Sequence, residues 1–153
     1  MTIFSLIRFS HLTNNSIAKY SEKFATSDIK GSMWTMEEFA EYVKSLTNKN
    51  LFFEKIQPKM RKIVVDVLKS VEDMVLYRKK SMELYGFDFM VDDNFNPWII
   101  EINSSPAMDY STDITEKLVK MVLEDVIKVT IDYGQAKNKK NISTGNFTCI
   151  HQD

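Results

Sequence analysis

Two acidic residues interrupt stretches of this sequence that are otherwise apolar and β-favouring. Asp88 lies within LYGFDFMV and Glu101 within PWIIEIN, and the polar run DDNFNP separates the two stretches. This pattern predicts an antiparallel β-hairpin. If the hairpin is centred between Asn94 and Phe95, Asp88 and Glu101 lie directly opposite each other, with Cβ atoms about 5 Å apart.

Such a pair has an electrostatic cost, because two like charges repel and are unfavourable to bury. Strand side chains alternate between faces, so Ile99, Glu101 and Asn103 are expected on one face. Two carboxylates and an amide oxygen suit a hard cation such as Mg²⁺, which keeps waters or binds phosphate oxygens in its other positions. The alternative is that both acids are exposed or paired with Lys or Arg. A one-residue slip of the register would separate them.

Other chemistries fit the sequence less well. Asp92, Asn94 and Asn96 alternate as in a calcium-binding loop. However, Pro97 occupies the position that needs glycine, and Asn103 stands where a bidentate Glu is required. We therefore reject a calcium loop. The sequence also has no glycine-rich phosphate-binding motif and no Cys/His zinc spacing.

Helical periodicity predicts three helices around this hairpin. Thr35 and Glu38 have capping-box spacing, which predicts a helix over 36–46. Apolar residues from Met60 to Val75 recur every three or four positions and predict a long helix over 57–80. A third helix is expected over 113–132, with Asp113 as its N-cap.

The remaining segments predict strands and loops. Residues 2–9 are typical of a strand and 10–16 of a loop, and the hairpin occupies 82–103. Residues 134–146 are polar and expected to be mobile, while 147–150 could add a short strand. Trp98 is expected to be a packing residue. The predicted class is α+β, an antiparallel sheet with packing helices.

Composition limits the function further. The chain has 153 residues, is 44% hydrophobic and carries a net charge of −1, so one folded domain is expected and overall charge argues against nucleic acid as a partner. No apolar run approaches the roughly 18–20 residues of a membrane helix, so no membrane partner is expected. The single cysteine, Cys149, fits a reducing compartment such as the cytoplasm.

Two motifs resemble a known family. The run ELYGFDFMVDDNFNPWIIEINSSPAM is similar to the C-terminal metal-binding hairpin of the tubulin–tyrosine ligase-like family, and HLTNN at 11–15, followed by MW at 33–34, is similar to that family's HLTN segment. The resemblance covers about residues 5–133. It implies that 1–133 are the C-terminal part of an ATP-grasp domain and that 134–153 are a polar tail. The run from 111 to 132 and TGNFTCIHQ resemble the glycylase branch.

The resemblance also implies a cofactor set of ATP and Mg²⁺ and a role for six residues. In the family, a longer stretch usually separates the phosphate-facing arginine from HLTN than the spacing of Arg8 and His11 here. The matching positions are Arg8 for the terminal phosphate, Thr13 and Asn14 for the nucleotide, and Asp88, Glu101 and Asn103 for the metal.

The implied activity is that of an ATP-dependent ligase that joins glycine to glutamate side chains of tubulin through an acyl phosphate, in the cytoplasm, cytoskeleton and cilium. Basic clusters at 59–62, 78–80 and 137–140 would attract an acidic tubulin tail, or are ordinary solvated faces. The alternatives are a polyglutamylase and a catalytically incomplete tubulin-binding module. The chain resembles only the C-terminal portion of such a ligase, so on its own it is expected to be a fragment that could be inactive.

Overall fold

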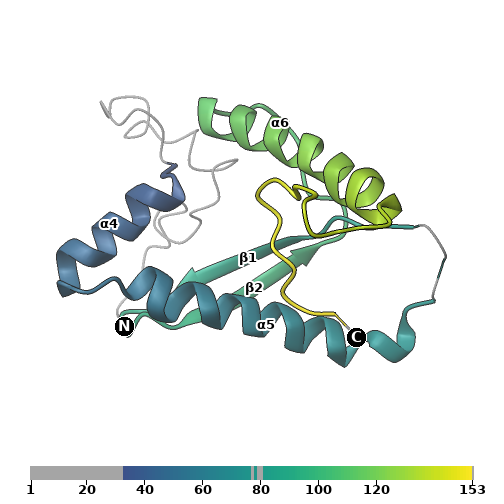
Figure 1. Cartoon of the computed structure of the whole chain (residues 1–153). Helices are drawn as coiled ribbons and strands as arrows, with labels where there is room; N and C mark the ends of the chain where they lie inside the picture. Colours follow the sequence, from purple (N-terminus) through teal and green to yellow (C-terminus); the bar gives the residue numbers. More distant parts are fainter. Residues whose placement is uncertain (1–32, 77, 79–80, 153) are drawn as a thin grey trace. The chain divides into compact units, whose positions relative to one another are not determined.

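The computed structural model describes residues 33–76, 78 and 81–152. The predicted strand at 2–9, the loop at 10–16 and the candidate residues Arg8, Thr13 and Asn14 lie outside the described residues. The chain divides at Thr35, and every described helix and strand belongs to the unit Thr35–Asp153 (Figure 1).

Helix α4, Met36–Thr47, begins at a capping box. The backbone N–H of Glu38 donates to Thr35 Oγ1 at 3.2 Å, and the N–H of Thr35 donates to Glu38 Oε2 at 2.7 Å. These two bonds satisfy amides that the first helical turn cannot pair internally. The helix predicted over 36–46 is confirmed.

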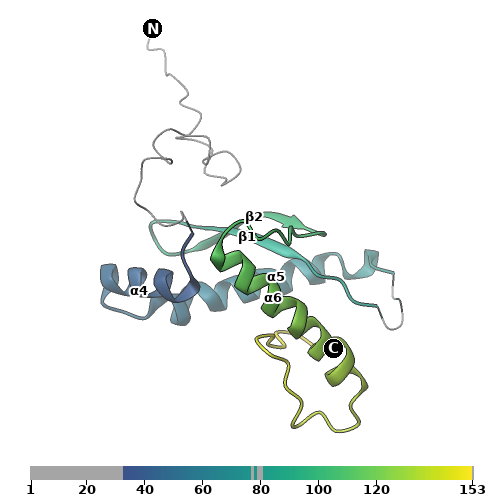
Figure 2. The same ribbon diagram turned by 90° about the horizontal axis from the view of Figure 1, so that it is seen from above.

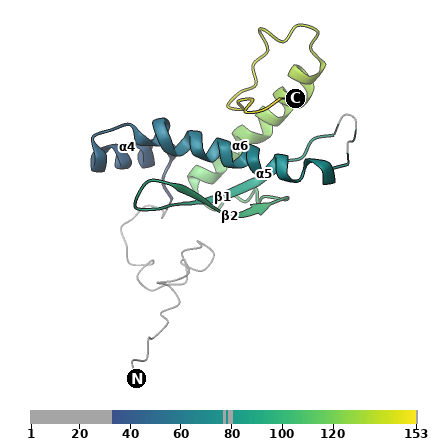
Figure 3. The same cartoon turned by 90° about the horizontal axis from the view of Figure 1, so that it is seen from below.

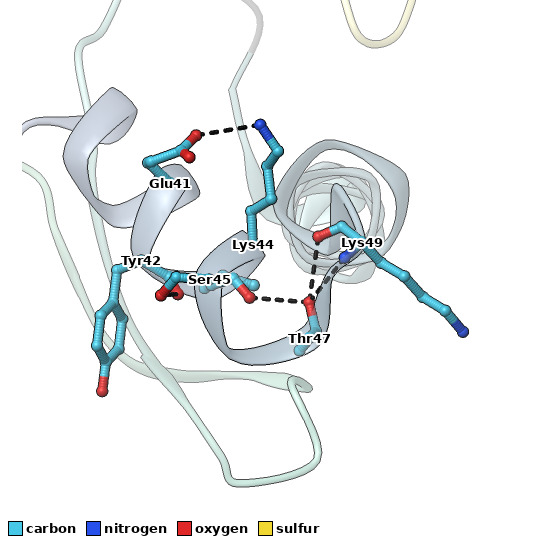
Figure 4. A network of polar contacts seen from close by, with 7 residues as sticks. Glu41, Tyr42, Lys44, Ser45, Thr47 and Lys49 are labelled. Atoms are coloured by element: carbon cyan, nitrogen blue, oxygen red, sulfur yellow. Dashed lines mark hydrogen bonds and ion pairs between the residues drawn. The ribbon is translucent and has the colours of Figure 1, made fainter.

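The end of α4 is closed by a left-handed residue, Asn48, and by Thr47. Figure 4 shows the contacts of Thr47 with Lys49. Asn48 has φ 54° and donates its N–H to the carbonyl of Lys44 at 2.8 Å. The hydroxyl of Thr47 accepts the N–H of Lys49 at 3.3 Å and donates to the carbonyl of Val43 at 2.8 Å. The chain therefore turns sharply and enters the next helical segment.

That segment starts as a π-helix, η1, Phe52–Ile56, and continues as α5, Gln57–Ser70, with Pro58 in its first turn. The junction forms the core of the unit, in which the side chains of Val43 and Ile56 are fully buried. Ala40 and Phe52 complete the buried cluster.

The long helix predicted over 57–80 is wrong at its C-terminal end. Helix α5 stops at Ser70, whose hydroxyl donates to the carbonyl of Val67 at 2.7 Å and so competes with helical pairing. Only a 3₁₀ turn, η2, Glu72–Met74, follows. The apolar side chains at 74–76 are exposed, so no buried face supports a longer helix.

The predicted hairpin is confirmed as an antiparallel pair of strands, β1, Gly86–Val91, and β2, Pro97–Asn103. Helix α5 packs against this pair (Figure 3). Val91 and Phe95, at the turn end, contact the buried cluster of α4 and η1. The turn end of the hairpin is therefore the end that the core holds.

Helix α6, Asp113–Ile127, continues as a π-helix, η3, Lys128–Tyr133. Its N-cap is Thr112 rather than the predicted Asp113. Thr112 Oγ1 accepts the N–H of Thr115 at 3.1 Å, and Thr115 Oγ1 accepts the N–H of Thr112 at 2.8 Å. Asp113 instead lies in the first turn, where a negative charge favours the positive end of the helix dipole.

The segment after η3 returns to α6 (Figure 2). Cys149 and Ile150 then line a hollow together with Arg61 and Val65 of α5. The backbone N–H of Asn146 donates to Asp125 Oδ2 at 2.8 Å, and Asn146 Nδ2 donates to the same oxygen at 2.9 Å. The C-terminal end of the segment 134–146 is therefore bonded to α6. Residues 147–150 do not pair with either described strand, so the short strand is not formed.

Within the described residues the fold comprises three α-helices with short π and 3₁₀ segments and one two-stranded antiparallel sheet. The α+β class is confirmed. None of the described helices is both long enough and apolar enough to cross a membrane.

Candidate functional site

The turn of the hairpin is organised by the carboxylate of Asp92. Asp92 Oδ1 accepts the backbone N–H groups of Asn94 and Asn96 at 2.9 and 2.8 Å. Asp92 Oδ2 accepts Asn96 Nδ2 at 3.2 Å and Trp98 Nε1 at 2.9 Å. These hydrogen bonds, led by that from Trp98, lower the pKa of Asp92 to about 2. Trp98 itself is 62% exposed, so its predicted packing role is wrong, and its indole N–H fixes the turn instead.

Two lysines tie this turn to the helix beneath it. Lys55 Nζ, from η1, donates to the carbonyl of Asn94 at 2.6 Å, and Lys59 Nζ, from α5, donates to Asn96 Oδ1 at 2.7 Å. The lysines are four residues apart, which places them on one helical face. The turn is therefore held by side chains as well as by the apolar core.

The strand register changes along the hairpin. Near the turn, Val91 pairs with Pro97 and Phe89 with Ile99. A β-bulge follows, after which Asp88 pairs with Glu101. The predicted pairing of the two acids is confirmed, but the single register assumed for the whole hairpin is wrong on the turn side because Ile100 is an additional residue.

The bulge also changes which side chains share a face. Cross-strand partners lie on the same face of a sheet. Ile99 therefore lies with Phe89, whereas Glu101 lies with Asp88 on the other face. The expectation that Ile99 and Glu101 share a face is wrong, since the extra residue between them interrupts the alternation.

Three polar side chains meet on the open face at the end of the hairpin away from the turn. Asn103 Nδ2 donates to Glu101 Oε1 at 3.2 Å and lies 3.5 Å from Asp88 Oδ2. The three residues predicted as a metal set are thus brought together, although the sequence alone required an assumed register to do so.

The electrostatics of this cluster favour a cation. Partial burial raises the pKa of Asp88, and the hydrogen bond to Glu101 and the negative charge of Glu101 raise it further. The amide of Asn103 places its N–H₂ group between the two carboxylates, where it partly offsets their repulsion. A cation would relieve the same repulsion more completely.

The donor set can be compared with what a metal requires. Two carboxylates and an amide that can turn its oxygen inward match the oxygen ligands of Mg²⁺. Across the part of the chain that the structure describes, no group of three or more His, Cys, Asp or Glu side chains gathers at one point. An ion held by the two carboxylates and the amide alone would fill its other positions with water or phosphate oxygens, as Mg²⁺ does.

A second built feature, at Asp125, was missed from the sequence. Its residue is only 3% exposed, yet it is charged, and Lys128 Nζ donates to Asp125 Oδ1 at 2.6 Å. Hydrogen bonds from Asn146 and Lys128 lower its pKa to about 2. Asp125 also borders an apolar cavity of about 350 Å³ between α6 and Phe147. An isolated Asp within an apolar helical stripe is the signal that could have indicated it.

Comparison with known proteins agrees with this geometry. The sequence pattern of the Tubulin-tyrosine ligase family matches residues 6–139. The chain is 51% identical over 147 residues to Tubulin glycylase 3B of Tetrahymena thermophila. The aligned region covers 95% of this chain and 12% of that protein. It is 49% identical to Tubulin glycylase 3C of the same organism, over 95% of this chain and 14% of that protein.

A human relative, Protein monoglycylase TTLL8, is 38% identical over 96% of this chain and 18% of its own length. The chain thus spans less than a fifth of these curated relatives. The resemblance predicted from the hairpin and HLTNN motifs is confirmed, including its glycylase branch. The match covers most of the sequence and includes the whole hairpin, and the chain therefore belongs to the tubulin-tyrosine ligase family.

Proposed function

We propose that this chain forms the metal-binding part of an ATP-dependent ligase of the ATP-grasp type, which joins glycine to glutamate side chains of tubulin. The observation that carries the proposal is the meeting of Asp88, Glu101 and Asn103 on one face of the hairpin in a member of this family. The glycylase names of its relatives support glycine as the amino acid.

The chemistry explains why a cation is needed. A glutamate carboxylate resists attack by an amine, because oxide is a poor leaving group. Its oxygen first attacks the γ-phosphorus of ATP and ADP leaves. The glycine amine then attacks the acyl carbon and inorganic phosphate leaves. Mg²⁺ bound at this site would neutralise charge on the phosphate oxygens.

The residues of this chain act by holding and orienting. Asp88 and Glu101 supply two anionic ligands from opposite strands, and Asn103 supplies a neutral oxygen after its amide turns. Because the strands fix all three backbones, the ligands need little reorganisation when the ion binds. By family resemblance, Thr13 and Asn14 contact the nucleotide and Arg8 faces the terminal phosphate.

The partners follow from the same proposal: a glutamate in the acidic tail of tubulin, and glycine, in the cytoplasm, the cytoskeleton and the cilium. Of the basic residues on α5, Lys59 already donates to Asn96 and Lys62 pairs with Asp66. Lys139 lies over the ring of Tyr133, with its Nζ 4.6 Å from the ring centroid. An acidic tail would therefore be attracted mainly by the basic side chains of these clusters other than Lys59, Lys62 and Lys139. Residues 1–133 would form the ligase portion and 134–153 an appended tail.

The test is a chimaera, because the chain spans only part of its relatives. The stretch of Tetrahymena Tubulin glycylase 3B that aligns with this chain is replaced by this sequence, and tubulin is incubated with Mg-ATP and labelled glycine. The chimaera should incorporate glycine, and its Glu101→Gln version should lose this activity while remaining folded. Asp93→Asn, on the exposed turn, is the matched control and should leave activity intact.

Several outcomes would contradict the proposal. Unchanged activity in the Glu101→Gln chimaera would remove the metal role. Incorporation of labelled glutamate in place of glycine would indicate a polyglutamylase. A chimaera that binds tubulin without ligating would favour the incomplete binding module, as would failure of the 153-residue chain to bind Mg-ATP in calorimetry when the chimaera is also inactive.

A further inference from the structure

The two arms of the hairpin differ in length between the turn and the carboxylate pair. Starting from the pair Val91 and Pro97, Asp88 is three residues away along β1 and Glu101 is four residues away along β2. The extra residue is Ile100, which has no pairing partner of its own in the ladder. A continuous ladder from the turn would pair Asp88 with Ile100.

The same continuous ladder would place Glu101 opposite Phe87. Phe87, Phe89 and Val91 are the residues of β1 with half-buried side chains (Gly86, also half-buried, has none), and Val91 packs on the core, so they define the covered face. Glu101 would then lie on the covered face, and Asp88 would remain on the open one. The two carboxylates would be separated by the sheet.

We infer that the bulge at Ile100 is a face switch: it moves Glu101 and Asn103 from the covered face of the hairpin to the open face that carries Asp88. The inference rests on the proposed function only where it treats Asp88, Glu101 and Asn103 as metal ligands, since the strand geometry is independent of any metal. Ile100 is thus a positioning residue that acts through the backbone.

The side chains explain why the strand adopts the bulge. With it, Ile102 pairs with Phe87, and Glu101 and Asn103 lie on the open face with Asp88. Without it, a carboxylate would lie beside Phe87 and Ile102 would be fully on the open side. An apolar pair on this face is more favourable than a carboxylate beside the Phe87 ring, and this offsets leaving one residue out of the ladder.

This reasoning gives an unusual expectation for deletions. Removing Ile100 equalises the two arms, so Asp88 and Glu101 stay paired although Glu101 moves one position closer to Pro97. Removing Ile102 is the matched control, because it deletes another exposed isoleucine of β2 (42% exposed, against 58% for Ile100). That deletion moves Asn103 opposite Phe87, away from the carboxylates.

The register is tested without a metal by thiol bridging. In a Cys149→Ser background, the double variants D88C/E101C and F87C/E101C are treated with the fluorogenic bifunctional reagent dibromobimane. Only D88C/E101C should be bridged, both in the full chain and after deletion of Ile100. Transfer of bridging to F87C/E101C, or its loss from D88C/E101C in the folded deletion variant, would overturn the inference.

The effect of the bulge on metal binding is tested by titrating Mn²⁺ into the 153-residue chain. Mn²⁺ takes the same oxygen ligands as Mg²⁺. The wild type and the Ile100 deletion should bind with similar Kd, and the Ile102 deletion should bind about tenfold or more weakly. Equal weakening by both deletions would overturn the inference. Absence of Mn²⁺ binding by the wild type, together with the expected bridging pattern, would instead refute the metal role and leave the face switch standing.

Circular dichroism checks that each variant folds. If the Ile100 deletion does not fold, insertion of one alanine between Asp88 and Phe89 equalises the arms from the other strand. It should preserve bridging of D88C/E101C, and loss of bridging in that folded variant would count against the switch.

Discussion

Asp88 and Asp92 lie four residues apart on the same arm of the hairpin, and their pKa values are displaced in opposite directions. Asp92 faces four donor groups and has a pKa of about 2. Asp88 faces another carboxylate, and its pKa is raised. The first carboxylate holds the turn, and in the proposed function the second would be satisfied by a cation.

Asp125 extends the comparison to a different part of the fold. Like Asp92, it is surrounded by donors, in this case from Asn146 and Lys128, and its pKa is about 2. Both of these acids are also more buried than Asp88, which is exposed. Burial and several donors aimed at the carboxylate thus go together in Asp92 and Asp125, whereas Asp88 faces a second carboxylate.

The largest expected effect concerns the core that holds the turn end. Ile56→Ala removes a fully buried side chain from the cluster that Val91 and Phe95 contact. We expect a loss of about 2–5 kcal/mol in the free energy of unfolding, measured with urea. Val71→Ala, at an exposed position after α5, is the control, and equal losses for both would show that the turn end is not held by this core.

Asp88→Asn tests the site end directly. It should weaken Mn²⁺ binding by about 10–100-fold, because one anionic ligand is lost. In metal-free buffer it should leave stability unchanged or higher, since the repulsion from Glu101 is gone. Asp92→Asn should have the opposite effects: Mn²⁺ binding should be kept, and the protein should unfold at a lower temperature. Calorimetric titration and thermal unfolding separate the two, and identical behaviour of the variants would contradict the comparison.

Gly145→Ala tests the donor-rich environment of Asp125. Gly145 has φ 63°, and an added Cβ would overlap the Asp125 carboxylate. The backbone strain alone should cost about 1–2 kcal/mol, and the segment after η3 should become more sensitive to protease. Gly134→Ala is the control: its Cβ would meet the Val129 carbonyl at 3.5 Å, an ordinary contact, so a loss of stability there as large as at 145 would refute the explanation.

The pH dependence of the free energy of unfolding should reflect the lowered pKa values of Asp92 and Asp125. A carboxyl whose folded pKa lies below its unfolded value contributes stability above the unfolded pKa and loses it as pH falls through the folded pKa. For Asp92 and Asp125 this loss should occur between about pH 4, near the ordinary value, and the folded value of about 2. The double variant D92N/D125N should be less stable at neutral pH and show a shallower acid decline in urea unfolding. Parallel profiles would contradict this assignment.

The sequence was sufficient for the parts of the fold that depend on local patterns. The capping box at Thr35 and the alternation around Asp88 and Glu101 predicted α4, the hairpin and the pairing of the acids. The end of α5 was not predictable from periodicity, because the apolar spacing continues to Val75 while no described element covers those side chains.

The rest of the site depends on contacts distant in sequence. The bulge at Ile100 follows from a competition between the turn register and the pairing of Ile102 with Phe87, which no spacing rule records. The bonds from Lys55 and Lys59 cross nearly forty positions, and that between Asp125 and Asn146 crosses 21. The alternating Asp92, Asn94 and Asn96, considered as a calcium loop, are a self-bonded turn.

The placement of Lys55 and Lys59 at the turn has a consequence for the ions that reach this hairpin. Their ammonium groups bond neutral oxygens of Asn94 and Asn96, so their positive charge is not cancelled by these contacts. Five strand residues from Asn96 to Glu101 span roughly 15 Å, about twice the screening length of about 8 Å at physiological salt. The two lysines thus hold the turn end while salt screens their positive charge at the other end. A dication that approaches Asp88 and Glu101 would therefore meet little repulsion from the lysines.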